Sequence, residues 1–287
     1  MMQVREFFRA RKPVVASILM PTFGEARFAR WAVESVRRQT IENIELFIIC
    51  DGSPAPMVSF FEELAAEDSR IRVYCFQKSE RTGEPYRDTI IKTKARGRYI
   101  FYCSHDDLWF PNHIKALCDL MRHKVFVHSL HVSVKESEFQ EDAFISRIIY
   151  ADLAVGTYRE KMQNTAVQKN FFGLTYGAHT FKAYRRLKEG WTTTPPGVWT
   201  DLHMWRKLLE GFPSGCGTCK KVTALNFPAY CRSGWSAQKR EEELAFYFKK
   251  IREPDFIEKV NEMARQIVTE AVLKNNRLNG GSIVGVG

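Results

Sequence analysis

The chain has 287 residues, of which 45% are hydrophobic and 26% charged, the balance of a globular protein with a sizeable core. No apolar run reaches the roughly 18 residues that a membrane-spanning helix needs, and the first residues include Glu6 and lack the apolar core of a signal peptide. The chain has seven cysteines, an odd number that favours reduced thiols over disulfides. Together these features predict a cytoplasmic protein. Peripheral contact with the inner membrane surface is left open.

The formal net charge is +10, which favours a partner that carries phosphate, such as a nucleotide, a nucleic acid or an anionic lipid. The basic residues are spread along the chain, and no helix-turn-helix, zinc-finger or RNA-binding signature occurs. We therefore expect no nucleic-acid partner. A basic surface without a specific partner remains an alternative.

Strands and helices alternate in the first part of the chain. Apolar runs at residues 14–20, 44–50, 71–76 and 99–103 predict buried strands, and helical patterns separate them at about 28–36, 58–65 and 85–97. This order predicts a parallel α/β sheet with helices on both faces. In such sheets ligands bind beyond the carboxyl ends of the strands, so the residues that follow each strand are the first candidates for a site.

The pattern loosens after about residue 135. Residues 136–195 show no clear period, and a helix is then predicted from Thr200 to about Glu210. A short strand at 222–225 and two amphipathic helices at about 239–251 and 254–275 follow. The glycine-rich residues 279–287 are expected to be disordered.

Two familiar nucleotide-binding motifs are missing. Neither the Gly-x-Gly-x-x-Gly of dinucleotide-binding domains nor the Gly-x4-Gly-Lys-Ser/Thr of P-loop proteins occurs. A sheet without them can use carboxylates at strand ends, which accept hydrogen bonds from base and ribose and hold a divalent cation against a diphosphate. Asp51 follows the second predicted strand, and Asp106 and Asp107 follow the fourth.

Four short segments with these residues occur in a recognisable order: Pro21-Thr22-Phe23, Asp51-Gly52-Ser53, Arg87 before Gly97-Arg98-Tyr99-Ile100, and Asp106-Asp107-Leu108-Trp109-Phe110-Pro111. The series, within residues 14–135, resembles inverting glycosyltransferase family 2, which has the GT-A fold. The resemblance implies a mixed α/β sheet with a parallel nucleotide-binding half, helices on both faces and a C-terminal helical extension. It also implies metal-assisted transfer of one sugar from a nucleoside-diphosphate sugar to an acceptor hydroxyl.

The resemblance gives each matching residue a role. Thr22 and Phe23 would line the base pocket, Glu25 would reach the ribose or base, Asp51 would accept a base N–H, Arg87 would face the diphosphate, Asp106 would bind the ribose, and Asp107 would bind a divalent cation, Mn²⁺ or Mg²⁺. Taken alone, Asp51 also fits a turn beside Gly52, and the Asp106-Asp107 pair fits a cap for a helix opened by Pro111. The family commonly has Asp-x-Asp-Asp, where Ser104 and His105 precede the pair here.

An inverting transferase needs a base near the acceptor hydroxyl. Thr200-Asp201-Leu202-His203 resembles the family's carboxylate at a helix start, so Asp201 is the candidate base and His203 ranks second. The alternative is an aspartate that only stabilises the helix N-terminus. The segment from Tyr230 to Ser236 resembles the loop that closes on the diphosphate, where Arg232 would hold phosphate, although the family's histidine is absent; a surface loop is the alternative.

The resemblance divides the chain into a donor-binding half at residues 1–135, an acceptor-side half of the same domain at 136–240, and C-terminal helices with a disordered tail at 241–287. The acceptor would be a glycan, a lipid-linked saccharide or a protein. The rival functions are a non-catalytic relative that binds nucleotide sugars or glycans, and a nucleotidyltransferase. Cys216 and Cys219 fit buried thiols, since a structural zinc would need two more ligands.

Overall fold

The computed structural model describes residues 13–24, 27–136 and 145–279. The predicted role of Glu25 and the predicted disorder beyond Asn279 lie outside these ranges. Within them, no helix is both long enough and apolar enough to cross a lipid bilayer.

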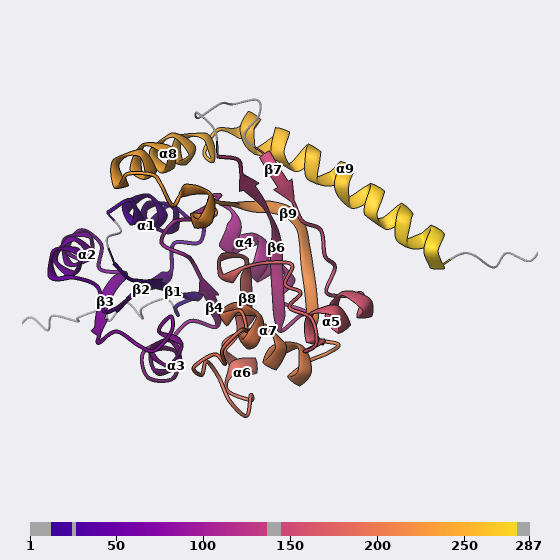
Figure 1. The fold of residues 1–287 in the computed structure, drawn as a ribbon, viewed down its shortest axis with the longest axis horizontal. Coiled ribbons are helices and arrows are strands. Elements are labelled where there is room, and N and C mark those ends of the chain that lie inside the picture. Colours follow the sequence, from indigo (N-terminus) through magenta and orange to yellow (C-terminus); the bar gives the residue numbers. More distant parts are fainter. Residues whose placement is uncertain (1–12, 25–26, 137–144, 280–287) are drawn as a thin grey trace, which may run out of the picture.

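The first part of the chain forms the alternating strands and helices that the sequence predicts. The strands are β1 (Ala16–Thr22), β2 (Ile44–Asp51), β3 (Ile71–Phe76) and β4 (Tyr99–Tyr102), and the helices between them are α1 (Ala29–Arg37), α2 (Ala55–Glu67) and α3 (Glu84–Thr93). β1 pairs in parallel with β2 and β4, and β2 pairs in parallel with β3. Every residue of β2 is buried, because helices cover both faces; Figure 1 shows α1 and α3 on opposite sides of these strands.

Strands of both directions then extend the same sheet. In chain order the elements are β5 (Leu108–Trp109), α4 (His113–Leu120), β6 (Phe126–Val134), β7 (Ile145–Ile148), α5 (Gly156–Gln163), the 3-10 turn η1 (Leu174–Tyr176), β8 (Gly177–Thr180), α6 (Phe181–Tyr184), α7 (Thr200–Gly211) and β9 (Cys216–Asn226). The strand order is β3-β2-β1-β4-β8-β6-β9-β5, with β7 beside β6. β8 is antiparallel to both β4 and β6, whereas β9 is parallel to β6. The described strands thus form the predicted mixed sheet with a parallel half.

The predicted helices of the C-terminal part are present. A 3-10 turn, η2 (Ala229–Arg232), precedes α8 (Ala237–Lys250) and α9 (Pro254–Asn279), and α9 extends away from the body in Figure 1. β9 begins at Cys216, so it is much longer than the predicted strand at 222–225. The exposed Lys220 and Lys221 in its middle resemble a loop in the sequence; in the structure they lie at a bulge between two segments of β9 that both pair with β6.

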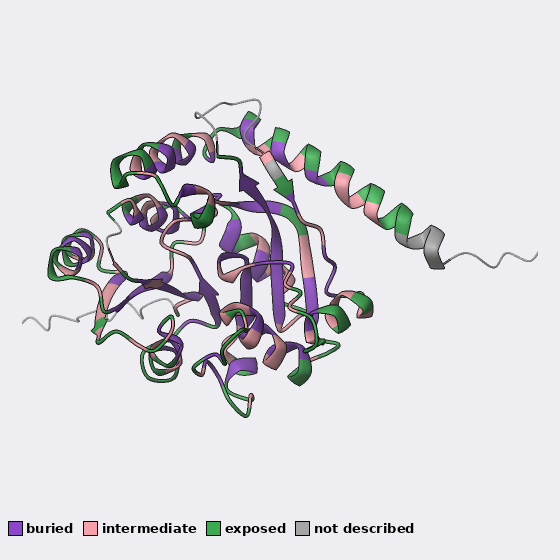
Figure 2. Cartoon of the chain, in the orientation of Figure 1, coloured by how far each residue is buried: buried purple, intermediate pink, exposed green. Residues whose placement is uncertain are grey.

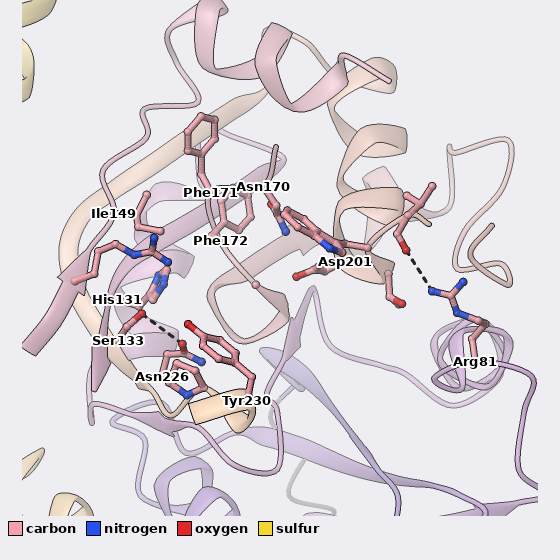
Figure 3. Close-up of a pocket in the computed structure, with 16 residues that line it drawn as sticks. Arg81, His131, Ser133, Ile149, Asn170, Phe171, Phe172, Asp201, Asn226 and Tyr230 are labelled. Atoms are coloured by element: carbon pink, nitrogen blue, oxygen red, sulfur yellow. Dashed lines mark hydrogen bonds between the residues drawn. The ribbon is translucent and has the colours of Figure 1, made fainter. Parts of the chain in front are cut away.

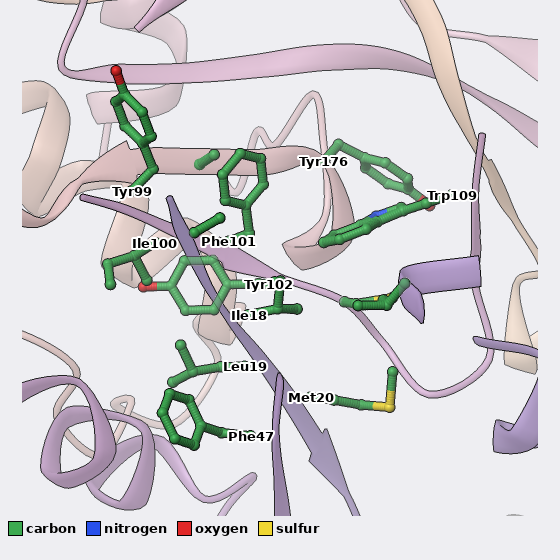
Figure 4. Packing of buried hydrophobic residues seen from close by; sticks show 14 of the residues in the cluster. Ile18, Leu19, Met20, Phe47, Tyr99, Ile100, Phe101, Tyr102, Trp109 and Tyr176 are labelled. Atoms are coloured by element: carbon green, nitrogen blue, oxygen red, sulfur yellow. The ribbon is translucent and has the colours of Figure 1, made fainter. Parts of the chain in front are cut away.

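Among the described residues, the buried hydrophobic side chains form two clusters. Figure 4 shows part of the larger one, in which Leu19 of β1, Phe47 of β2 and Phe101 of β4 are buried together with Trp109. The smaller cluster lies under α8 and α9 and includes Leu130, Leu225, Tyr247, Phe248 and Val260. Figure 2 shows that the buried residues of α9 belong to its first turns; Ala264 is the last one in its described part. Cys216 and Cys219 are free thiols on β9.

Candidate functional site

A cavity of about 470 Å³ opens at the carboxyl ends of β1, β2 and β4. Its walls come from the loops after these strands and from the N-terminal parts of α3, α7 and α8. We call it the strand-end cavity. Six residues predicted from the sequence line it: Thr22, Phe23, Asp51, Arg87, Asp106 and Asp201. Two other predicted site residues, Asp107 and Arg232, do not.

Arg87 is a buried cation with unused donors. Its Nη2 donates a hydrogen bond to the Thr82 carbonyl, whereas Nε and Nη1 have no partner within the described ranges. The guanidinium carbon lies 4.6 Å from the centre of the Trp191 ring. Burial lowers the pKa of Arg87, and nearby Glu84 opposes this by favouring the charged form. A buried guanidinium that lines a cavity with two free donor groups is suited to an anion.

The oxygens of Asp51 are held by the loop between β3 and α3. Oδ1 accepts a hydrogen bond from the Ser79 backbone N–H at 2.6 Å, and Oδ2 accepts from the Ser79 hydroxyl at 2.9 Å and from Lys78 Nζ at 2.8 Å. Gly83 lets this loop approach, because it has φ +76° and a Cβ there would lie 3.3 Å from the Asp51 Cβ. The Asp51 side chain therefore bonds across to the next loop rather than within its own turn.

The neighbouring residues Asp106 and Asp107 have different surroundings. Asp107 is buried, and its two oxygens accept four hydrogen bonds, from the hydroxyls of Thr175 and Tyr176, the Asn226 side-chain amide and the Phe227 backbone. Burial and the Asp106 charge raise the pKa of Asp107 to about 7, and the hydrogen bonds oppose this shift. Neither aspartate caps α4, which begins at His113.

Asp106 lines the strand-end cavity and pairs with an arginine that the sequence did not predict. Arg240 of α8 donates from Nη2 to Asp106 Oδ2 at 3.3 Å, and its guanidinium carbon lies 5.0 Å from the centre of the Phe28 ring. Its Nε is buried without a partner in the described part of the chain. Arg240 lies near the start of α8, whose first turn has no acidic residue. A positive charge at this position is unfavourable for the helix, because the N-terminal end of the helix dipole is itself positive. That signal in the sequence could have marked Arg240.

A second cavity, of about 500 Å³, adjoins the first. We call it the adjoining cavity. Phe171, Trp199 and Tyr230 line it, and the last two are 51% and 79% exposed. Polar side chains also line it, and Figure 3 shows His131 and Arg81 on opposite sides of Asp201.

His131 and Asn170 supply buried polar atoms to the adjoining cavity. His131 Nδ1 and Asn170 Oδ1 have no hydrogen-bond partner among the described residues. The His131 ring stacks on Tyr176 at 3.9 Å, and burial lowers the pKa of His131 to about 3, so the ring is neutral at physiological pH. The adjoining cavity thus combines aromatic faces and uncharged hydrogen-bonding groups with the charged side chains of Arg81, Arg147 and Asp201.

Asp201 lines both cavities. It lies in the first turn of α7, where its Oδ1 accepts a hydrogen bond from the Leu202 backbone at 2.8 Å. Burial raises the pKa of Asp201 to about 6, opposed by backbone hydrogen bonds and the Arg87 charge. A carboxyl group that titrates near neutrality is suited to accept a proton. His203, the second candidate, lines neither cavity.

The family model described as "Glycosyl transferase family 2" matches residues 17–188, more than half of the chain. The chain belongs to glycosyl transferase family 2. The putative glycosyltransferase EpsH of Bacillus subtilis is 27% identical over 170 residues, which cover 59% of this chain and 46% of EpsH. An uncharacterized glycosyltransferase of Rickettsia felis is 32% identical over 120 residues, 42% of this chain and 19% of the relative. The chain thus spans less than half the length of these two relatives.

Solved structures of glycosyltransferases share the fold. S. aureus TarS 1–349 has a TM-score of 0.55 at 10% identity and covers 83% of this chain and 71% of its own. The mannosyltransferase PcManGT of Pyrobaculum calidifontis, in complex with GDP-Man and Mn²⁺, has a TM-score of 0.50 at 14% identity, over 96% of this chain and 82% of its own. TarS 1–349 is also known in complex with UDP-GlcNAc. The fold is therefore of the predicted GT-A type.

A divalent cation, implied by the family resemblance, needs oxygen or nitrogen ligands that face the donor. Asp107 accepts four hydrogen bonds elsewhere, and Asp106 pairs with Arg240. Ser104 stands where the family commonly has a carboxylate, and His105 packs against two phenylalanine rings. The described ranges hold no group of three or more histidine, cysteine, aspartate or glutamate residues that could bind a metal. These side chains do not fit a resident cation, and we derive no step through one.

Arg232 lines neither cavity. Its Nε and Nη2 bond to Glu243 Oε2 and Oε1 at 2.6 and 2.5 Å, and both side chains are fully buried. Contact with phosphate would require Arg232 to leave this pair, at the cost of an unpaired buried charge. Arg240, three residues before Glu243, is the cation that α8 contributes to the strand-end cavity.

Proposed function

We propose that this family member transfers one sugar from a nucleoside-diphosphate sugar to an acceptor hydroxyl, with inversion at the anomeric carbon. The strand-end cavity would hold the donor and the adjoining cavity the acceptor. The observation that carries the proposal is that Asp201 lines both cavities, so that one carboxylate borders the place where the new bond would form. Membership of the family favours glycosyl transfer over nucleotidyl transfer.

The donor site follows from the residues of the strand-end cavity. Thr22 and Phe23 would contact the base, Asp51 would accept a base N–H after releasing Lys78, Asp106 would reach the ribose, and Arg87 would bind the diphosphate. Support comes from buried polar atoms without partners in the described part of the chain, Thr22 Oγ1 and Arg87 Nε and Nη1. Each such atom costs about 1–3 kcal/mol unless a ligand supplies its hydrogen bond. A metal role for Asp107 and a phosphate role for Arg232 stay predictions, which their present partners oppose.

In the proposed reaction the acceptor oxygen attacks the anomeric carbon and forms the new glycosidic bond. The bond from that carbon to the diphosphate oxygen breaks, and the acceptor's proton passes to an oxygen of Asp201. The nucleoside diphosphate leaves with the electron pair of the broken bond, toward the Arg87 guanidinium, which stabilises the developing charge. A single displacement from the face opposite the leaving group inverts the anomeric centre.

We propose a saccharide as the acceptor, whether it is a free glycan, lipid-linked or attached to a protein. The faces of Phe171, Trp199 and Tyr230 would contact the apolar faces of sugar rings, and Asn170 and His131 would bond to hydroxyls. The cytoplasmic location and contact with the membrane surface stay predictions.

The Asp201→Asn variant tests the proposal, because it removes the base and keeps the size of the side chain. Donor binding should persist, and turnover should fall by roughly 10²-fold or more, the usual contribution of a positioned base. Binding is measured by calorimetry with nucleoside-diphosphate sugars that differ in base and sugar. Turnover is measured as release of the nucleoside diphosphate, with water or a saccharide as acceptor. Glu210→Gln, on the same helix and exposed, is the matched control.

Two results would redirect the proposal. If Asp201→Asn turns over donor as fast as the wild type, Asp201 only stabilises the start of α7. If the wild-type protein binds a nucleoside-diphosphate sugar but never releases the diphosphate, even slowly to water, the non-catalytic binding relative is the better description.

A further inference from the structure

We infer that Arg240 acts in this protein where other GT-A enzymes use a divalent cation: together with Arg87 it neutralises the donor diphosphate, so nucleotide binding and turnover need no metal. The inference rests on the proposed function, because it assumes that a nucleoside diphosphate occupies the strand-end cavity. It concerns how the charge of that diphosphate is balanced.

The two carboxylates after β4, those of Asp106 and Asp107, already have partners within the protein. A hard cation such as Mn²⁺ or Mg²⁺ needs carboxylate oxygens with free lone pairs. Both oxygens of Asp107 accept two hydrogen bonds each, which uses the lone-pair sites of a carboxylate. Asp106 lines the cavity, but it already faces the positive charge of Arg240. A cation beside Asp106 would therefore be repelled by a fixed guanidinium.

The surroundings of Arg240 hold its guanidinium in a position that is suited to bind an anion. Its side chain is 9% exposed, and it is held from two directions, by the Asp106 carboxylate and by the Phe28 ring. Its buried Nε has no partner within the described ranges, although it belongs to a residue that lines the cavity. Asp106 orients the guanidinium before a ligand enters, and Nε is left to bond to a phosphate oxygen.

Arg87 and Arg240 line the same cavity from different helices. Arg87 lies near the start of α3 and Arg240 near the start of α8, and each keeps an unused buried N–H in the described structure. The N-terminal end of α8 has Lys239 beside Arg240 and no acidic residue in its first turn, so the helix dipole adds to the positive potential there. Two guanidinium groups match the two charged groups of a diphosphate.

The inference makes an unusual prediction about added metal. Manganese binds nucleoside diphosphates in solution and reduces their negative charge. A site built from arginines then gains nothing from manganese and loses part of its Coulomb attraction. The dissociation constant should stay the same or rise when manganese is added, whereas a metal-dependent site shows the opposite.

The test measures binding of UDP, GDP, ADP, CDP and TDP to the full chain by calorimetry, in excess chelator and in excess manganese. For the diphosphate that binds best, we expect chelator not to weaken binding by more than about threefold. Arg240→Ala should weaken metal-free binding about 10- to 100-fold, because a hydrogen bond to a charged group is lost. Lys249→Ala, on the same helix but exposed, makes the same charge change and should bind like the wild type.

Arg240→Lys keeps the inference testable if Arg240→Ala does not fold. This variant keeps a positive charge beside Asp106 but removes the Nε–H that we assign to a phosphate oxygen. We expect metal-free binding of the diphosphate to be weaker than in the wild type, and manganese not to restore it. If Arg240→Lys binds as tightly as the wild type in chelator, the Nε contact is not made and the inference is overturned.

Failure of the inference differs from failure of the proposed function. If a nucleoside diphosphate binds tightly in manganese and roughly 10²-fold more weakly in chelator, a metal balances the charge and the inference is overturned, while the proposed donor site stands. Unchanged metal-free binding by Arg240→Ala also overturns it. If none of the five diphosphates binds under either condition, the proposed function fails and the inference fails with it.

Discussion

The two parts of the sheet contribute to the site in different ways. In the parallel part, Thr22 and Asp51 are the last residues of β1 and β2, and Asp106 lies in the loop after β4, so the order of the chain brings them to one edge of the sheet. In the second part, Asp201 and Arg240 come from helices that reach the same cavity through packing between distant segments. The strand order therefore positions most of the proposed donor contacts, whereas the positions of Asp201 and Arg240 depend on how the second part of the chain packs against the first.

Asp107, in the loop after β4, accepts hydrogen bonds from residues of the second part of the chain, in η1 and at the end of β9. Its substitution should therefore have the largest effect, which is on stability. Asp107→Asn replaces an acceptor oxygen with an amide that faces hydrogen-bond donors from η1 and from the end of β9. We expect the free energy of unfolding to fall by about 2–4 kcal/mol, measured by urea denaturation. Asp119→Asn on α4 is the control and should change it little, because its side chain is 43% exposed and pairs with exposed basic residues. If Asp107→Asn keeps full stability and loses metal-dependent binding, the predicted metal role of Asp107 is right.

Arg87→Ala should weaken donor binding and leave the proposed acceptor site unchanged. It removes a buried cation from the strand-end cavity, so nucleoside-diphosphate binding should weaken about 10- to 100-fold, measured by calorimetry. The free energy of unfolding should change little, because loss of the Thr82 hydrogen bond and the Trp191 contact is offset by removal of two buried nitrogens that have no partner within the described ranges. Lys92→Ala on α3 is exposed and makes the same charge change as a control. Equal binding by both variants would place the diphosphate elsewhere.

The smallest effect on activity is expected for a substitution in the adjoining cavity, where we propose that the acceptor binds. Tyr230 is 79% exposed on the adjoining cavity, so Tyr230→Ala removes one stacking face without disturbing the core. The KM for a saccharide acceptor should rise by about fivefold, in line with the modest value of one aromatic contact, and the KM for the donor should stay the same. Leu273→Ala, exposed on α9, is the control. A rise in the donor KM instead would show that the two cavities do not divide the substrates as proposed.

The sequence predicted the parallel part well, for a physical reason. Strands buried on both faces appear as continuous apolar runs, and the polar residues after them stand out against that background. β6 carries no such signal, although all nine of its residues are buried. It contains His128, Ser129 and His131, and His128 is satisfied by distant groups such as the Thr218 hydroxyl and the Ala151 carbonyl. Such partners cannot be read from the sequence of the strand.

The candidate site was predicted in part for the same reason. The position of Asp106 after a strand indicates a cavity residue, but the sequence does not show that Asp107 turns to η1 and β9. The partner of Asp106 is Arg240, 134 residues away, and only the docking of α8 brings them together. Motifs at strand ends therefore predicted which segments meet, and tertiary packing decided which of two adjacent carboxylates lines the cavity.

The central claim is that Asp201, on the boundary of the two cavities, accepts the proton in the transfer. The most direct test is the pH dependence of kcat/KM for release of the nucleoside diphosphate, in the wild type and in Asp201→Asn. Because the pKa of Asp201 is raised to about 6, the carboxyl is protonated and inactive below that pH and ionised above it. We predict that the wild-type rate rises with pH through about 6 and then levels off, and that the variant is slow and lacks this rise. A variant that keeps the same rise would show that another group accepts the proton.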